Sequence, residues 1–299
     1  MTVKPRPDGV LLNDATSQRV LAIEEIIDLD RYPIHDLESR RGKELIDRAK
    51  ADLASAAALC LPGFLRADAA ALAAAQVAPL AARGVRHSTQ HNVYFVDDSA
   101  VPPGSPRTTQ GSSKHNIAGD LIAGDALIRK VYEYEPLRRF TAAVVGEERL
   151  YLQADPLSSL NIMIFGAGDR FGWHFDRTPY SVTILLQPPE QGGVFEYVPY
   201  LRPRREADYD ENVNEQVVGA PEDENFEVLA SVLAGERKHV VDVDLQAGTM
   251  LILLGRHSLH RVTEIAGPRP RIQSILAYEP APGVVFNDET RIRFYGRAR

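Results

Sequence analysis

From Leu150 to the C-terminus, the chain divides into short segments of the kind that form β-strands, and this feature constrains the fold most. The segments are rich in β-branched and aromatic residues, as in YSVTILLQ, GTMLILLG and RIQSILAYE, and Gly, Pro or Asp clusters separate many of them. Several short strands in succession are typical of a sandwich or barrel, not of alternating β–α–β units. We therefore expect a double-stranded β-helix core of the jelly-roll or cupin-like kind.

The first half of the chain is helical in character. Residues 37–60, 66–84 and 126–146 carry apolar residues at helical spacing, and Pro79 predicts a kink in the second segment. Residues 97–120 are rich in Pro, Gly, Ser and Thr and are predicted to form a long loop that covers a binding site. The fold class is thus mostly β with N-terminal helices packed on the core.

The predicted organisation is a single structural unit with two parts. Residues 1–149 form the helical region and lid loop, and residues 150–299 form the catalytic core. An acidic insertion near 205–235 interrupts the strands, since Glu206 to Glu227 contains nine Asp or Glu and no Lys or Arg. We interpret it as a solvated surface segment, followed by a short helix within 224–238.

Composition excludes several classes of protein. The chain has 299 residues, of which 44% are hydrophobic, and a net charge of -7 that argues against nonspecific nucleic-acid binding. Its single cysteine, Cys60, permits no intrachain disulfide, which favours a reducing compartment. There is no apolar run of membrane-spanning length and no signal-peptide pattern. We expect a cytoplasmic protein with a small-molecule substrate and no nucleic-acid or membrane partner; a homodimer is compatible with the sequence.

The stretch GWHFD places a histidine and a carboxylate, His174 and Asp176, two residues apart in a strand-like segment. On a strand, residues i and i+2 point to the same face, so the two groups should project together. Burying them without a partner would be costly. A metal ion is the partner that their chemistry suggests, but two ligands make a poor site, so a third is needed.

The third ligand is predicted to be His260, which opens the strand-like segment HRVTEI. His257, in the turn-like GRHS just before it, is the alternative. A strand pair in a β core would bring His260 opposite His174 and Asp176. Two histidines and one carboxylate make the facial triad of non-haem Fe(II) oxygenases, which leaves coordination positions open for a cosubstrate and dioxygen.

Arg271 follows His260 by eleven residues, in RPRIQSILAY. A buried guanidinium is costly unless it pairs with an anion, and arginine binds carboxylates in a bidentate manner. The distal carboxylate of 2-oxoglutarate is such an anion. The sequence therefore predicts Fe(II) held by His174, Asp176 and His260, 2-oxoglutarate as cosubstrate bound by Arg271, and dioxygen as oxidant.

With these motifs, the sequence resembles the iron(II)- and 2-oxoglutarate-dependent oxygenases. GWHFD, GGVFEYVP and AGTMLILLGRHSLHRVTEIAGPRPR look most like the branch of free amino-acid halogenases, lysine halogenases among them, and their hydroxylating relatives. In the halogenases, glycine replaces the carboxylate ligand and chloride fills the vacated position. This chain keeps Asp176. The resemblance therefore implies hydroxylation, desaturation or cyclisation of an unactivated C–H in a free amino acid or amine derivative.

Candidate substrate contacts are fewer and weaker. Trp173 and Arg177 flank the metal ligands, although both have the wrong strand parity unless the chain turns at Gly172. Asp155 is a candidate partner for a substrate ammonium, and Arg107 and Lys114 of the loop are candidates for a carboxylate. Two other functions stay open: a sensory or binding protein that keeps the metal without turnover, and a hydroxylase that acts on a partner protein.

Overall fold

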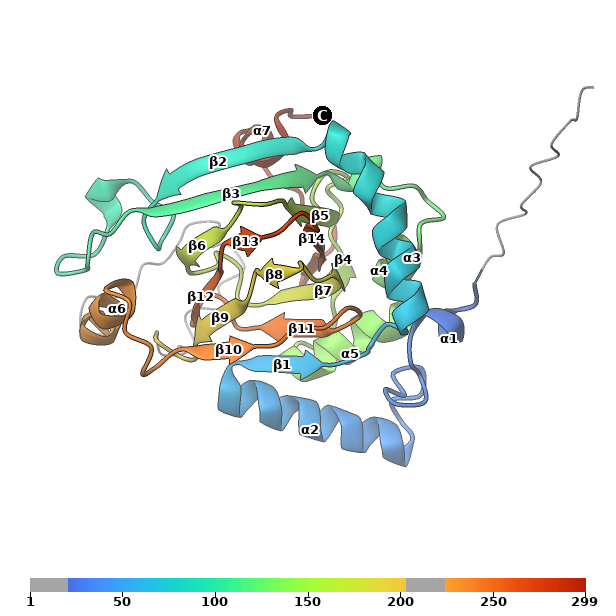
Figure 1. The fold of residues 1–299 in the computed structure, drawn as a ribbon. Coiled ribbons are helices and arrows are strands. Elements are labelled where there is room, and N and C mark those ends of the chain that lie inside the picture. The colour runs from blue at the N-terminus through green and yellow to red at the C-terminus, as the bar shows by residue number, and fades with distance from the viewer. Residues whose placement is uncertain (1–20, 203–223) are drawn as a thin grey trace, which may run out of the picture.

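The computed structural model describes residues 21–202 and 224–299, and their strands form two main antiparallel sheets (Figure 1). The larger sheet has the order β1-β11-β7-β14-β5-β3-β2, and the smaller has the order β10-β9-β12-β6. Apolar side chains from both sheets pack against each other, Phe165, Leu185 and Leu251 from the larger sheet meeting Phe195 and Val262 from the smaller. This arrangement confirms the expected double-stranded β-helix.

The strand bounds show how the two sheets are assembled from distant parts of the chain. The larger sheet contains β1 (Ala58–Leu61), β2 (Val85–His91), β3 (Gln110–Ile117), β5 (Leu160–Phe165), β7 (Ser181–Gln187), β11 (Met250–Leu253) and β14 (Arg271–Leu276). The smaller contains β6 (Phe171–His174), β9 (Phe195–Val198), β10 (Val241–Val243) and β12 (Leu259–Val262). Two short pairs join β4 (Tyr151–Leu152) to β15 (Tyr278–Glu279) and β8 (Gln191–Gly192) to β13 (Ile265–Ala266).

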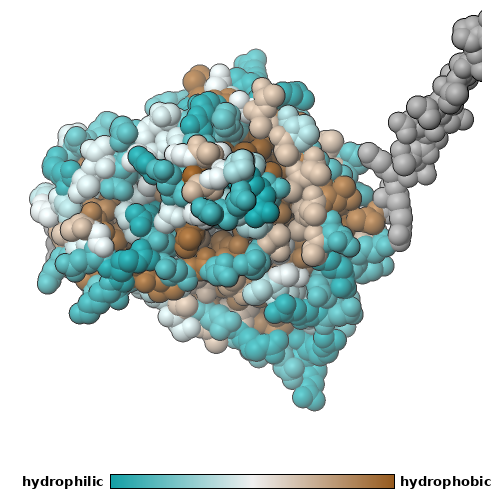
Figure 2. All heavy atoms as spheres, in the orientation of Figure 1, coloured by the Kyte–Doolittle hydropathy of each residue, from teal (hydrophilic) through white to brown (hydrophobic). Residues whose placement is uncertain are grey.

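Helices cover the outer face of the larger sheet, where they form the main hydrophobic core (Figure 1). The α-helices are α1 (Ile23–Ile26), α2 (Arg40–Ala56), α3 (Ala67–Val77), α4 (Leu127–Glu133), α5 (Glu135–Val145), α6 (Phe226–Leu233) and α7 (Asp288–Tyr295). Short 3-10 helices span Ala78–Arg83, Asp98–Ala100 and Gly119–Leu121. In the view of Figure 2, apolar side chains are visible near the centre of the face shown, among mostly hydrophilic ones.

The predicted helices are present but shorter than expected. The first ends at Ala56, because Ala57 takes a left-handed conformation (φ 57°) and the next residues pair with β11 as strand β1. The second ends at Val77, and Pro79 lies in a 3-10 turn where the kink was predicted. The third divides into α4 and α5 at Glu135, just before Pro136.

The prediction of one long loop over 97–120 was wrong in its second half. Gln110–Ile117 form β3, which pairs with β2 along seven residues and with β5. Its buried side chains include the polar residues Ser112, Lys114 and Asn116. The sequence of β3 does not alternate between apolar and polar residues, so it gave no strand signal. The reason is that the buried face of β3 carries polar side chains.

The two predicted parts of the chain contribute strands to the same sheet. Strands β1 to β3 come from the range 1–149 and β5, β7, β11 and β14 from 150–299, and all of them share one sheet. The short helix predicted within 224–238 is confirmed as α6. Most of the acidic insertion lies outside the described residues. Among the helices of the described segments, none is long and apolar enough to cross a membrane.

Candidate active site

The three predicted metal ligands lie together at the end of one strand pair. His174 ends β6, and its Cα is directly opposite that of His260 in β12. The centroids of the two imidazole rings are 4.1 Å apart. Asp176 lies two residues beyond the end of β6, so its prediction as a strand residue was wrong. Its backbone amide instead donates to the carbonyl of Gly255, 3.0 Å away.

The ligand atoms face a common point. Oδ1 of Asp176 is 3.7 Å from Nε2 of His174 and 3.4 Å from Nε2 of His260, and the three ligand atoms lie within 4.8 Å of one another. Each histidine donates its Nδ1–H to the carbonyl two residues earlier, Gly172 at 2.7 Å and Ser258 at 2.8 Å. These bonds fix both rings in the tautomer that presents Nε2 to a metal.

The pKa shifts of the three groups reflect their burial and their closeness to one another. Burial lowers the pKa of His174 well below its usual range, and His260 lowers it further, so its ring is a neutral ligand. Burial alone would raise the pKa of Asp176, but His260 and His174 outweigh that effect and hold the pKa at about 2. Burial would likewise lower the pKa of His260, yet the Asp176 carboxylate raises it. An ionised carboxylate beside two imidazoles is a donor set for iron.

Gly255 allows Asp176 to reach this position. A Cβ on Gly255 would lie 2.1 Å from Oδ2 and 2.6 Å from Cγ of Asp176, which is closer than atoms can approach. Alanine at position 255 would therefore force the Asp176 side chain or the backbone beside it to move. We had not predicted this role, because one glycine before HSLH carries no signal in the sequence.

Gly255→Ala is expected to weaken iron binding by roughly 10- to 100-fold, the usual cost of disturbing a ligand's support. The measurement is an anaerobic Fe(II) titration. Gly124→Ala is the matched control, since a Cβ there meets nothing within 4 Å. Equal iron affinity in Gly255→Ala and the wild type would show that Asp176 is not held against this glycine.

Arg271 is the most deeply buried large cation among the described residues, at 1% exposure. Its Nη1 contacts the side-chain oxygen of Gln273, whereas Nη2 is buried without a hydrogen-bond partner. Burial lowers the pKa of Arg271 to about 10. A buried guanidinium with an unused N–H group is suited to an anionic partner. Arg269, two residues earlier, is exposed and donates to the carbonyl of Pro189.

His257 takes no part in the ligand cluster. It is buried in the turn before β12, where its backbone amide donates to Leu254 and its carbonyl accepts from the amide of Arg202. Within residues 21–202 and 224–299, the only group of three metal-binding side chains is the one that contains His260.

The chain resembles known proteins over most of its length. The model of the family described as Halogenase D matches residues 42–282. The chain belongs to the Halogenase D family. Among curated proteins, none matches the chain significantly.

Solved structures similar to this Halogenase D family member share its fold at low identity. The carbocyclase SnoK from nogalamycin biosynthesis, a non-haem α-ketoglutarate-dependent protein, is 15% identical, with a TM-score of 0.53 over 82% of this chain and 89% of SnoK. The epimerase SnoN from the same biosynthesis is 15% identical, with a TM-score of 0.51 over 79% and 81%. AviO1 from Streptomyces viridochromogenes is 17% identical, with a TM-score of 0.50 over 80% and 96%.

Two of the predicted substrate contacts have structural partners in this member of the Halogenase D family. Asp155 is fully buried and accepts from Nε of Arg291 at 2.8 Å and from the amides of Leu157 and Phe286, which joins the β4–β5 connection to the C-terminal segment. Trp173 is 4% exposed, and the guanidinium of Arg261 lies over its ring. These contacts argue against a role for either side chain in binding substrate.

Two more of the five predicted contacts are Arg177 and Arg107; the fifth, Lys114, is buried in β3. Arg177 donates to the carbonyl of Phe95 at 2.9 Å, and Arg107 donates to the carbonyl of Asp98 at 3.0 Å. Arg107 lines a pocket of about 500 Å³, whereas Arg177 reaches the segment that forms its wall. Only Arg107 therefore has the expected place beside a cavity.

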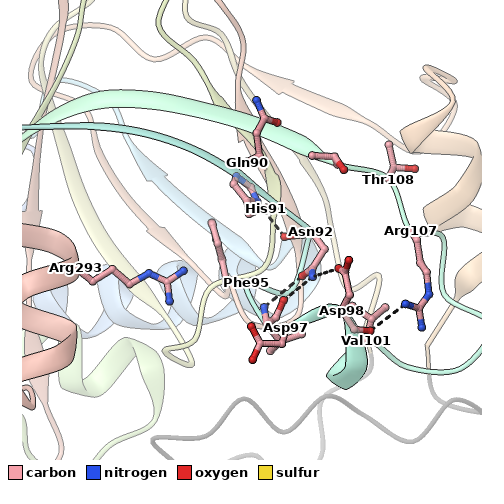
Figure 3. A pocket seen from close by; sticks show the side chains of 12 residues that line it. Gln90, His91, Asn92, Phe95, Asp97, Asp98, Val101, Arg107, Thr108 and Arg293 are labelled. Carbon is pink, nitrogen blue, oxygen red and sulfur yellow. Dashed lines mark hydrogen bonds between the residues drawn. The ribbon is translucent and has the colours of Figure 1, made fainter.

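Phe95 lines the pocket and also contacts the metal ligand His174. The lining of the pocket is mostly polar: Gln90, His91, Asn92, Phe95, Val96, Asp97, Asp98, Val101, Arg107, Thr108, Thr109 and Arg293. In Figure 3, Arg293 of α7 and Arg107 lie on opposite sides, with Phe95 between them. The Phe95 ring meets that of His174 edge-on, with centroids 5.3 Å apart. Phe95 also has a positive φ of 55°, an uncommon conformation for a large residue.

Proposed function

We propose that the protein is an Fe(II)- and 2-oxoglutarate-dependent oxygenase that hydroxylates, desaturates or cyclises an unactivated C–H bond of a small substrate. A free amino acid or amine derivative is the proposed substrate. The observation that carries this proposal is the complete set of two imidazoles and one carboxylate that share a point inside the β core. Membership of the Halogenase D family and the unused N–H of Arg271 support it.

Each residue has a distinct part in this function. His174, Asp176 and His260 would hold the iron, and Arg271 would bind the distal carboxylate of 2-oxoglutarate. Iron with 2-oxoglutarate supplies the activation of dioxygen. The carbonyls of Gly172 and Ser258 keep the two imidazoles oriented, and the buried surroundings exclude water from the reacting groups.

The pocket supports a polar substrate of modest size. Its volume of about 500 Å³ is within the range of small-molecule sites. Asp97 and Asp98 on its wall offer carboxylates to a substrate ammonium, and Thr108 and Thr109 offer hydroxyl groups. A test is succinate release with Fe(II), 2-oxoglutarate and a panel of free amino acids. Absence of substrate-stimulated succinate with every amino acid would favour a sensory role or a protein substrate.

The wild-type product should contain no chlorine, even at high chloride concentration. Asp176 would fill the position that the halogenating relatives leave to chloride, so a halide would have no place at the metal. Mass spectrometry should show a product about 16 mass units heavier or about 2 lighter than the substrate. Asp176→Gly is the companion variant, which should give some chlorinated product if the pocket stabilises a halide and no product otherwise. A chlorinated wild-type product would contradict the assignment of Asp176 as a ligand.

A further inference from the structure

Phe95 lies where the pocket and the metal ligands meet. It lines the pocket of about 500 Å³ together with mostly polar residues. The centroid of its half-buried ring is 4.2 Å from that of His91, another lining residue (Figure 3). On its other side, the same centroid is 5.3 Å from that of His174 and 6.2 Å from that of Phe171. A substrate group that extends from the pocket toward His174 therefore has to pass beside this ring.

The backbone of Phe95 is in an unfavourable conformation. Its φ of 55° lies in the left-handed region, which glycine and asparagine adopt far more readily than a large aromatic residue. The turn is held by Asn92, whose side-chain oxygen accepts from the amides of Tyr94 at 3.1 Å and Val96 at 3.3 Å. The amide of Phe95 donates to the carbonyl of Asn92, 3.2 Å away. A large residue held in such a conformation points to a function for its side chain at that place.

Hydrogen bonds join this turn to the segment that carries two of the metal ligands. The amide of Phe175, which stands between those two ligands, donates to the carbonyl of Val93 at 2.8 Å. Arg177 donates to the carbonyl of Phe95 at 2.9 Å. The backbone that carries the Phe95 ring is thus bonded to the ligand segment on both sides of the turn, which fixes the ring relative to the ligands.

We propose that Phe95 is a specificity-determining residue, whose ring limits the width of the substrate group that reaches the metal ligands. The inference rests on the proposed function and deepens it, because it says what shape the reacting part of the substrate has. An unbranched chain of methylene groups is the narrowest aliphatic group, so it passes the ring, whereas a chain branched near the reacting carbon is excluded. The ring also offers this chain an apolar surface, in a pocket whose lining is otherwise mostly polar.

The test compares norleucine with leucine, two free amino acids that have the same atoms and charge and differ only in branching. Each is titrated anaerobically into protein loaded with Fe(II) and 2-oxoglutarate, and binding is followed by the visible absorption of the iron–2-oxoglutarate complex. The wild type should bind norleucine roughly 10- to 200-fold more tightly, the range that one methylene group is worth in a fitted pocket. In Phe95→Ala the two should bind nearly equally. Phe95→Leu keeps part of the bulk and should keep part of the preference.

A second pair of probes does not depend on an amino-acid substrate. Imidazole and the wider phenylimidazole are titrated into protein loaded with cobalt(II), which accepts the same kinds of ligand as iron and changes its visible spectrum when a new one binds. The wild type should bind imidazole and exclude phenylimidazole, and Phe95→Ala should bind both. If neither norleucine nor leucine binds, this pair decides.

Phe294→Ala is the control, because Phe294 is a phenylalanine of α7 that is 38% exposed and is not among the residues that line the pocket. It should behave as the wild type in both titrations. Iron and 2-oxoglutarate should bind equally well to the wild type and to all three variants.

Three results would overturn the inference. A general loosening of the turn in Phe95→Ala would weaken norleucine and leucine alike and leave their ratio unchanged. The wild type could bind the two amino acids equally, or Phe95→Ala could still exclude phenylimidazole. Failure of the proposed function is a different result: no amino acid would stimulate succinate release, while phenylimidazole would still distinguish Phe95→Ala from the wild type.

Discussion

Alanine in place of His260 is expected to abolish iron binding and turnover. His260 supplies one of three ligands, and its Nε2 lies 3.4 Å from the Asp176 carboxylate that shares the metal. The loss should exceed the roughly 10- to 100-fold that changes around the ligands cause, because a ligand itself is removed. An anaerobic Fe(II) titration measures the binding, and succinate release measures the turnover. His174→Ala and Asp176→Ala should give the same result.

His257→Ala is the matched control for this experiment. It removes a buried histidine three residues away that is outside the ligand cluster. Its iron binding should survive, although its folding stability should fall because a buried side chain is lost. Circular dichroism verifies that both variants are folded. Full activity in His260→Ala together with lost activity in His257→Ala would reverse the assignment of the third ligand.

Arg271→Gln should raise the apparent 2-oxoglutarate constant by orders of magnitude while iron binding survives. The guanidinium is buried, with one N–H group unused and another directed to Gln273. Losing a buried, hydrogen-bonded charge pair costs about 2–5 kcal/mol, or roughly 30- to 5,000-fold in affinity. Glutamine keeps polar atoms near the same position but removes the charge. Titration of 2-oxoglutarate against succinate release and against the visible absorption of the iron complex measures the shift.

Arg269→Gln is the control, because Arg269 is exposed and bonded to the Pro189 carbonyl at the surface. The 2-oxoglutarate constant of this variant should equal that of the wild type. An unchanged constant in Arg271→Gln and a raised one in Arg269→Gln would exchange the roles of the two arginines. No change in either would indicate a different cosubstrate.

The sequence predicted the β core well because its signals were local. Segments such as Ser181–Gln187 and Arg271–Leu276 are apolar and β-branched, and they form strands at the positions expected. His174 and His260 could be predicted to share a metal site because both fall in strand-like segments of one β core. Their direct opposition across β6 and β12 depends on strand register, which a single sequence does not specify.

Features that depend on tertiary contacts were missed. Residues 58–60 were interpreted as helix because apolar periodicity continues from the helix before them, but pairing with β11 makes them part of a strand. The role of Gly255 follows from its contact with Asp176, a residue 79 positions earlier in the chain. Asp155 was proposed as the partner of a substrate ammonium. Its actual partner, Arg291, lies 136 residues later, and nothing in the sequence indicates that contact.

The pairing of β1 with β11 has a consequence for how the chain acquires its structure. Ala58 of the first strand lies opposite Leu253. The strand β1 is therefore synthesised long before β11, and it cannot pair until β11 has been made. Closing such a long loop carries a large entropic cost before any contact compensates for it, and topologies of this kind fold slowly. The growing chain therefore exposes an unpaired strand edge on the ribosome. We expect its yield in cells to depend on chaperones and growth temperature more than its final packing would suggest.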